Sequence, residues 1–241
     1  MLHRTLVGLL LILGLSFLCF LRQILPDYLN SVTFSVIIPS AGIIASYLEL
    51  KKFGLGLFEA VLDFGVCFAL IVFLPHLALV FLGVTFIFGF TFSGNIKFLL
   101  LNLFSFSSLG FVSLGSLFFL TARDFEILMV ILGAVVFDTF SYFGGKIFGR
   151  NQLVPSISPN KTAEGFLFGC LGHFIFVYMY GQQNWFLFGA TAVYFFSDLL
   201  KSKVKRALGI KDFGKILYEH GGILDRFDTH LGGFIFLRGF V

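Results

Sequence analysis

Long apolar segments separated by short polar breaks follow one another along almost the whole chain. The hydrocarbon core of a bilayer is about 30 Å thick and is crossed by roughly 20 residues of α-helix, which is close to the length of these segments. A last apolar run, Leu231–Val241, is too short to cross by itself. The pattern predicts an all-α polytopic membrane protein with about eight transmembrane helices and a short C-terminal apolar segment. The predicted spans lie near residues 4–25, 31–50, 55–74, 76–94, 97–120, 124–148, 162–180 and 184–200.

Composition excludes a water-soluble globular protein. Hydrophobic residues make up 58% of the 241-residue chain and charged residues 12%, whereas soluble domains are about 25% charged. The three cysteines, Cys19, Cys67 and Cys170, lie inside apolar runs without CxxC or His-rich spacing. We therefore expect inert thiols, with no disulfide and no zinc site. No small-residue cleavage site follows the first apolar run, so we interpret it as a retained helix.

The distribution of Lys and Arg predicts the orientation in the membrane. Eight crossings place the two long polar loops, 146–161 and 201–229, on one face, and most Lys and Arg residues at span ends fall on that face. Only Arg22 and Arg123 lie clearly opposite. The positive-inside rule then predicts a multi-pass cell (inner) membrane protein whose N-terminus and polar loops are cytoplasmic. We divide the chain into N-terminal transmembrane helices, 1–123, and a C-terminal transmembrane region, 124–241, which holds both polar loops and the candidate catalytic residues described below.

Asp138 lies within an apolar run, away from the nearest loop, where an ionisable residue is costly and functional by default. Ser141 and Tyr142 follow at i+3 and i+4, which places a carboxylate and two hydroxyl groups on one helical face. The alternative is a helix–helix hydrogen bond that fixes packing, and we favour a functional role. Glu59 and Asp63 share a face of an earlier predicted span, where we favour structural packing.

The segment SISPNKTAEG contains a helix-start signal. Ser158 followed by Pro159 predicts an N-cap and a first helical residue, which would place Lys161, Thr162 and Glu164 in the first turns. A helix N-terminus offers free N–H groups and a positive dipole, which suit a phosphate. Capping explains Ser158 and Glu164 but does not need Lys161, a cation near a positive helix end. The segment therefore predicts a phosphate-binding turn.

Residues 197–229 hold the densest cluster of charges in the chain. Lys201 and Lys205 are spaced i, i+4, as are Ser202 and Arg206, so the end of the preceding helix has a broad basic side. A positive surface over anionic lipid headgroups is the simpler explanation of these cations. An anion-binding site is the alternative.

Two acids, Asp198 and Asp225, bracket these cations. Carboxylates suit Mg²⁺, which commonly takes one or two of them together with substrate phosphates. The neighbouring cations would hold the other phosphate oxygens. The two glycines after His220 indicate a bend where the backbone passes close to another group. The cluster thus predicts a membrane enzyme that handles phosphates with a metal.

Residues 202–228 closely resemble the signature of phosphatidate cytidylyltransferases, also called CDP-diacylglycerol synthases. The family pattern is S-x-(apolar)-K-R, four residues, K-D-x-G, and then H-G-G-(apolar)-x-D-R-(apolar)-D. The helix with Asp138, the S-P-x-K-T-x-E-G segment and the S-D-L sequence at 197–199 are also similar, so the resemblance is specific over about 138–228. The matching signature positions are Ser202, Lys205, Arg206, Lys211, Asp212, Gly214, His220, Gly221, Gly222, Asp225, Arg226 and Asp228.

The resemblance implies the reaction CTP + phosphatidate → CDP-diacylglycerol + pyrophosphate in phospholipid biosynthesis. It implies dependence on Mg²⁺, with K⁺ as a candidate second cation, and suggests a homodimer. We expect CTP, phosphatidate and the lipid bilayer as partners, and no nucleic acid. Carried over by position, the metal-ligand candidates are Asp198 and Asp225. The candidate catalytic residues are Lys205, Arg206, Lys211, Asp212, His220, Arg226 and Asp228. The candidate substrate-binding residues are Asp138, Ser141, Tyr142, Lys161, Thr162, Glu164, Ser202, Gly221 and Gly222.

Two features depart from the family pattern. Tyr218 stands where the family usually has proline or a small turn residue, and the sequence after Asp228 is short. Two alternative functions stay open. A related CTP-dependent membrane transferase would act on another lipid, such as an archaeol-type phosphate or a polyprenol. An anion transporter would use Asp63, Asp138 and the cationic loop, and would move a solute without nucleotide turnover.

Overall fold

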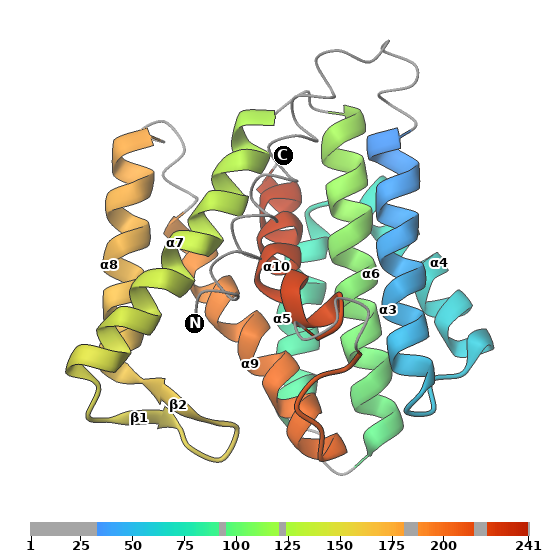
Figure 1. Cartoon of the computed structure of the whole chain (residues 1–241). Helices are drawn as coiled ribbons and strands as arrows, with labels where there is room; N and C mark the ends of the chain where they lie inside the picture. The colour runs from blue at the N-terminus through green and yellow to red at the C-terminus, as the bar shows by residue number, and fades with distance from the viewer. Residues whose placement is uncertain (1–32, 92–94, 121–123, 181–187, 215–220, 241) are drawn as a thin grey trace.

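The structure is a computed structural model, which describes residues 33–91, 95–120, 124–180, 188–214 and 221–240. The predicted first span and the positions Tyr218 and His220 lie outside the described residues. The fold is mostly helical, as predicted (Figure 1). Its elements are η1 (Thr33–Ile37, a π-helical turn), α3 (Ile38–Lys51), α4 (Leu57–Phe73), α5 (Leu77–Thr91), α6 (Ile96–Leu120), α7 (Asp124–Phe148), β1 (Gln152–Val154), β2 (Ser158–Thr162), α8 (Ala163–Tyr180), α9 (Ala190–Leu208) and α10 (Leu224–Phe240).

Two of these helices have the length and apolar composition needed to cross a membrane, Ile96–Phe118 in α6 and Phe125–Phe148 in α7. The apolar parts of α5 and α8, Leu79–Thr91 and Ala163–Met179, are shorter. Helices suit an apolar surrounding because each satisfies its own backbone N–H and C=O groups. These helices are consistent with membrane association, while the number of crossings and the orientation stay predictions.

The centre of the fold is α10, which packs against α5, α6, α7 and α9 (Figure 1). The last apolar run, which begins at Leu231, belongs to this 17-residue helix and does not form a separate short segment. Gly233 permits this close packing, because a Cβ there would lie 2.5 Å from Val130 Cγ1 and 2.8 Å from the ring of Tyr194. Small residues at such contacts let helix backbones approach each other.

The C-terminal end of α10 is held by two polar contacts. The buried side chain of Arg238 donates a hydrogen bond from Nη2 to the carbonyl of Ile71 at 3.4 Å, near the end of α4. A cation there is favourable because the last carbonyls of a helix lack helical partners. His76 Nδ1 donates to the carbonyl of Gly239 at 3.0 Å. These contacts fix the end of α10 that lies away from Leu224.

Glycines bring α7 and α8 into close contact. A Cβ on Gly165, in the first turn of α8, would lie 2.8 Å from the carbonyl oxygen of Ser141 and 3.1 Å from Gly145 Cα. Both of these neighbours are backbone atoms of α7. The contact therefore sets the start of α8 against the face of α7 that carries Ser141.

We expect Gly165→Ala to destabilise the protein by about 1–3 kcal/mol, because the new methyl group would overlap backbone. Gly83→Ala is the matched control, since nothing lies within 4 Å of the Cβ position at Gly83 of α5. Alanine is also the better helix former by about 1 kcal/mol. Thermal unfolding of the detergent-solubilised protein measures both variants. Equal melting temperatures for the two would contradict this packing.

An antiparallel hairpin of β1 and β2 interrupts the helices between α7 and α8. The prediction of a helix N-cap at Ser158 is therefore wrong, because pairing with β1 takes up the backbone where the first helical turn was expected. The helix α8 begins at Ala163. Thr162 supplies its cap, since the Thr162 hydroxyl accepts a hydrogen bond from the Gly165 N–H at 3.1 Å. The predicted all-α fold is corrected by this one hairpin.

Glu164 ties the base of the hairpin to α8. Its carboxylate accepts hydrogen bonds from the Arg150 N–H at 3.0 Å and from the side-chain amide of Asn151 at 2.8 Å. The Ala163 N–H donates to the carbonyl of Asn151 at 2.8 Å. Glu164, a predicted substrate-binding residue, thus holds the loop that carries the other residues of its segment.

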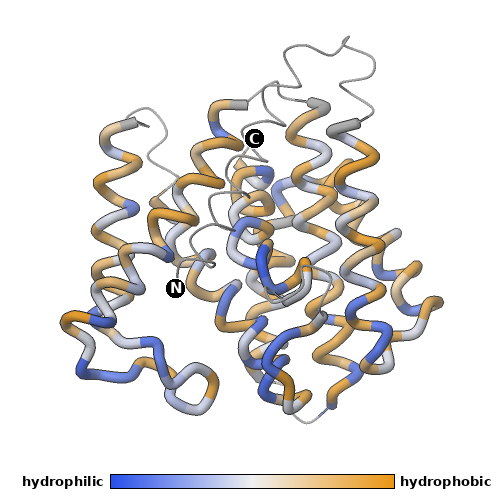
Figure 2. The backbone as a smooth tube through the Cα atoms, in the orientation of Figure 1, coloured by the Kyte–Doolittle hydropathy of each residue, from blue (hydrophilic) through white to orange (hydrophobic). Residues whose placement is uncertain are grey.

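Hydrophilic residues gather at the end of the molecule that holds the hairpin and the C-terminal end of α9 (Figure 2). Large apolar side chains are exposed along α3, α4, α7 and α8. An apolar flank with one polar end is the distribution expected where lipid surrounds the helices and water meets one end.

Candidate active site

A cavity of about 400 Å³ lies between α7, β2, α8, α9 and α10. One wall is apolar and consists of Phe137, Phe166 and Phe195. The other lining groups are mostly polar or charged. The predicted site residues that line this cavity are Asp138, Ser141, Tyr142, Lys161, Thr162, Asp198, Asp225, Arg226 and Asp228.

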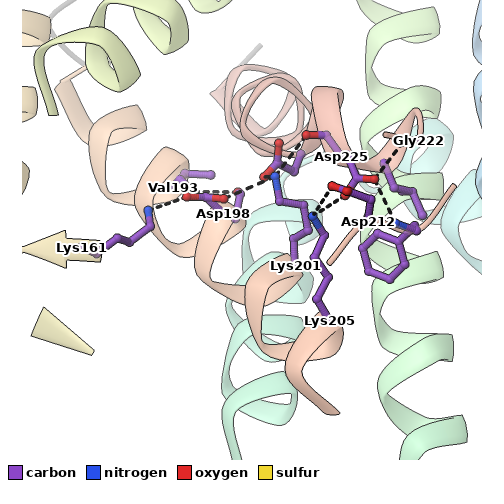
Figure 3. Close-up of polar contacts among 12 residues, drawn as sticks. Lys161, Val193, Asp198, Lys201, Lys205, Asp212, Gly222 and Asp225 are labelled. Atoms are coloured by element: carbon purple, nitrogen blue, oxygen red, sulfur yellow. Dashed lines mark hydrogen bonds and ion pairs between the residues drawn. The ribbon is translucent and has the colours of Figure 1, made fainter. Parts of the chain in front are cut away.

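Asp198, on α9, has both carboxylate oxygens paired with lysines (Figure 3). Lys161 Nζ, from β2, lies 2.5 Å from Oδ2, and Lys201 Nζ, one turn along α9, lies 3.3 Å from Oδ1. Lys161 also lies over the ring of Phe195, 5.0 Å from its centroid. Because Lys161 belongs to the hairpin and Asp198 to α9, this ion pair joins two sides of the cavity.

Lys201 is a site residue that sequence reasoning missed. Its ammonium group lies 2.5 Å from Asp228 Oδ2 and 3.2 Å from the backbone carbonyl of Asp225. Burial by itself would lower the pKa of Lys201, but Asp228 and Asp198 outweigh it and raise the pKa above the usual lysine range. A protonated lysine therefore links α9 to α10. Its i+3 spacing from Asp198 is the signal that could have identified it.

Asp225 organises the turn before α10. Its Oδ2 accepts hydrogen bonds from the N–H groups of Phe213 at 2.9 Å and Gly222 at 2.8 Å. Its Oδ1 is paired with Lys205, whose Nζ also lies 3.9 Å from Asp212 Oδ1 (Figure 3). One carboxylate thereby joins α9, the turn that follows α9 and the start of α10.

The paired glycines are required for different reasons. Gly221 has a φ of +85°, a left-handed conformation that other residues rarely adopt. A Cβ on Gly222 would overlap the carboxylate of Glu49, a buried residue of α3 that sequence reasoning also missed. The close approach predicted here is present, but the groups that approach Gly221 and Gly222 are the protein carboxylates of Asp225 and Glu49. Neither glycine lines the cavity.

Asp138, Ser141 and Tyr142 lie together on the wall that α7 contributes to the cavity, as their spacing predicted. Asp138 is exposed and lines the cavity, so its carboxylate faces open space and not a closed helix–helix contact. It faces the same space as Lys161 and Asp198.

The other predicted site residues that the structure describes do not line the cavity. Arg206 Nε donates to the carbonyl of Ile157 at 3.3 Å, which is a second link between α9 and the hairpin. Lys211 is exposed and Ser202 is half-buried. His220 lies outside the described residues.

The predicted metal ligands, Asp198 and Asp225, both reach the cavity, and Lys201 lies between them (Figure 3). The described residues contain no group of three or more His, Cys, Asp or Glu side chains placed to hold a metal. Mg²⁺ needs only one or two carboxylates when phosphates complete its coordination. The donor set therefore fits a metal that binds together with a phosphate, and the adjacent cations suit the phosphate itself.

Comparison with known proteins assigns the chain to a family. The model of a family described as "Cytidylyltransferase family" matches residues 3–241. The chain belongs to the cytidylyltransferase family. The match extends the resemblance found at 138–228 to nearly the whole chain, including the N-terminal helices.

Several curated proteins are similar to the chain in sequence. A phosphatidate cytidylyltransferase of Aquifex aeolicus (strain VF5) is 45% identical over 110 residues, which cover 44% of this chain and 42% of the relative. One of Staphylococcus aureus (strain COL) is 38% identical over 137 residues, or 52% and 53% of the two chains. One of Thermotoga maritima is 38% identical over 124 residues, or 44% and 46%. The chain thus spans about half the length of these relatives.

Proposed function

We propose that the chain is a phosphatidate cytidylyltransferase, which converts CTP and phosphatidate to CDP-diacylglycerol and pyrophosphate. The observation that carries the proposal is the cavity, where carboxylates and lysines from α7, β2, α9 and α10 meet at the polar end of apolar helices. Membership of the family and similarity to relatives of that name support the same reaction.

The proposed reaction transfers a nucleotidyl group between phosphates. An oxygen of the phosphatidate phosphate attacks the α-phosphorus of CTP and forms a new P–O bond. The bond between the α-phosphorus and the oxygen that leads to the β-phosphorus breaks, and pyrophosphate leaves with that oxygen and its electron pair. The attacking phosphate is already an oxyanion, so no strong base is required. The main task of the protein is to position the phosphates and stabilise their charge.

We assign phosphate binding to cations at the cavity. Lys161 and Arg226 line it, and Lys205 pairs with Asp225 at its edge. Lys161 and Lys205 each neutralise a carboxylate in the structure and carry ammonium groups that suit phosphate oxygens. Lys201 also lines the cavity, and from its half-buried position it holds α9 and α10 together.

We also propose Mg²⁺ as the metal, with Asp198 and Asp225 as its protein ligands and K⁺ as a candidate second cation. When bound, Mg²⁺ would neutralise charge on the phosphates of CTP. Asp212 lies beside Lys205 and Asp228 beside Lys201, so these two acids orient the lysines.

The position of the cavity fits a substrate that is part lipid. Phe137, Phe166 and Phe195 offer apolar surface next to the charged groups, as an amphiphilic phosphate requires. From the distribution of Lys and Arg we propose that this end faces the cytoplasm. A homodimer is the proposed assembly, on the resemblance to the family alone.

Purified full-length protein incubated with labelled CTP, Mg²⁺ and a panel of lipids tests the function. We expect CDP-diacylglycerol and an equal amount of pyrophosphate with phosphatidate, and neither product without Mg²⁺. Transfer to an archaeol-type phosphate or a polyprenol but not to phosphatidate would replace the proposed substrate. An absence of nucleotide turnover with every lipid would contradict a transferase.

A further inference from the structure

Glu49 is a buried carboxylate on α3 that contacts the start of α10. Its side chain has no exposed surface. Its Oε1 accepts a hydrogen bond from the Ile223 N–H at 2.6 Å, and its Oε2 accepts one from the Leu224 N–H at 3.1 Å. The first N–H groups of a helix have no partner within the helix. Glu49 therefore satisfies two donors at the N-terminus of α10, from a part of the chain with no predicted site residue.

Two turns of the signature close over this carboxylate. A Cβ on Gly214, after α9, would lie 3.1 Å from Glu49 Oε1, and one on Gly222, before α10, would overlap it. The neighbouring acid Asp225 accepts the N–H groups of Gly222 and Phe213. Glu49 and Asp225 together thus bind the backbone N–H groups of the turn after α9 and of the segment that leads into α10.

The chemistry of Glu49 suits a fixed anchor. A carboxylate is costly to bury unless it accepts strong hydrogen bonds, and a helix N-terminus provides both the donors and a favourable dipole. The two oxygens of the planar carboxylate accept the N–H groups of two consecutive residues, Ile223 and Leu224. They therefore also fix the direction in which the backbone enters α10. The orientation of the first turn of α10 is therefore set by α3.

We propose that Glu49 is a positioning residue of the active site. It does not line the cavity, and it acts by fixing the turn from which Asp225, Arg226 and Asp228 reach the cavity. The inference rests on the proposed cytidylyltransferase reaction, because Asp225 is a proposed metal ligand, Arg226 a proposed phosphate-binding residue and Asp228 the acid that orients Lys201.

A role in stability alone predicts a different result. Partial unfolding lowers the amount of active enzyme and so the apparent kcat, but it leaves the KM for CTP and the Mg²⁺ requirement of the folded fraction unchanged. Misplaced metal-binding and phosphate-binding side chains instead change the KM for CTP and the Mg²⁺ requirement of the folded enzyme. The two roles can therefore be separated.

The test uses Glu49→Gln in the full-length protein, because glutamine keeps the size and one acceptor oxygen but loses the charge. We expect kcat to fall, and the KM for CTP and the Mg²⁺ concentration for half-maximal rate to rise, each by about tenfold or more, as for other groups that orient ligands. Hydrogen exchange at the amides of Ile223 and Leu224 is expected to accelerate at least as much. Glu59→Gln is the matched control, since Glu59 Oε2 accepts the Gly56 N–H at 3.3 Å at the start of α4, and all values should stay at wild type.

An unchanged KM for CTP and an unchanged Mg²⁺ requirement in Glu49→Gln would overturn the positioning role, whatever its melting temperature. Should that variant not fold, Glu49→Asp keeps the charge on a shorter side chain, and wild-type values in it would overturn the role equally. A wild-type protein without activity on CTP and phosphatidate would instead overturn the proposed function. Exchange at Ile223 and Leu224 would then still show whether Glu49 fixes the turn.

Discussion

Asp225→Asn is expected to lower pyrophosphate release from CTP and phosphatidate by on the order of 10³-fold, the loss typical when a charge-stabilising group is removed from an active site. Asparagine keeps one oxygen for the N–H groups of Phe213 and Gly222 but has no charge to pair with Lys205. The variant therefore leaves Lys205 with only the more distant Asp212 carboxylate and removes a proposed metal ligand. A continuous pyrophosphate assay on purified protein measures the loss.

Asp63→Asn provides the control for this result. Asp63 is also a partly buried acid with a hydrogen-bond partner, since it accepts the Ser105 hydroxyl at 2.5 Å between α4 and α6. Asparagine keeps that acceptor oxygen. Neither Asp63 nor Ser105 lines the cavity. We expect near wild-type activity there. Full activity in Asp225→Asn would exclude Asp225 from the metal site.

Lys201→Met is expected to lose nearly all activity and about 3–5 kcal/mol of unfolding free energy, as when one partner of a buried ion pair is removed. Methionine resembles lysine in length but leaves Asp228 without its cation, while Asp198 keeps Lys161. The contact of Lys201 with the Asp225 carbonyl is lost as well. Chemical unfolding in detergent gives the stability change, and the pyrophosphate assay gives the activity.

Lys203→Met separates this effect from the loss of any lysine on α9. Lys203 donates to the carbonyl of Phe90 at 2.5 Å and lies outside the cavity, so we expect a change of about 1 kcal/mol. A second substitution, Asp228→Asn, should restore part of the stability of Lys201→Met, because it removes the buried charge that was left unpaired. Equal stability of Lys201→Met and Lys203→Met would contradict the role of Lys201 as the link between α9 and α10.

The parts of the site that could be predicted are those where charge interrupts an apolar pattern. Asp138 stands out because an acid is costly inside an apolar helix, and helical spacing alone placed Ser141 and Tyr142 beside it. Asp198 and Lys161 were predicted from different segments, and they form an ion pair across the cavity. The lengths of the apolar segments and the polar breaks between them likewise predicted most of the described helices within a few residues.

The parts that could not be predicted depend on contacts between distant segments. The cap expected at Ser158 is a sound local signal, but pairing with β1 overrides it. Lys201 was predicted only as part of the basic side of its helix, because nothing in the sequence indicates that Asp228 would lie beside it. Glu49 accepts hydrogen bonds from backbone N–H groups 174 and 175 residues away. Every residue except proline has such a group, so the sequence does not indicate which ones Glu49 will contact.

The two sides of the cavity differ in how well they tolerate amino-acid substitutions. Asp225 and Asp228 are carried by α10, most of whose residues are buried and whose glycines contact neighbouring helices. Substitutions on this side are therefore tolerated as poorly as in a close-packed protein interior. The hairpin is mostly exposed and reaches α9 through Lys161 and Arg206. Changes in substrate range are therefore easier to engineer on the hairpin, where a new side chain alters the shape of the cavity without disturbing the core that holds the acids.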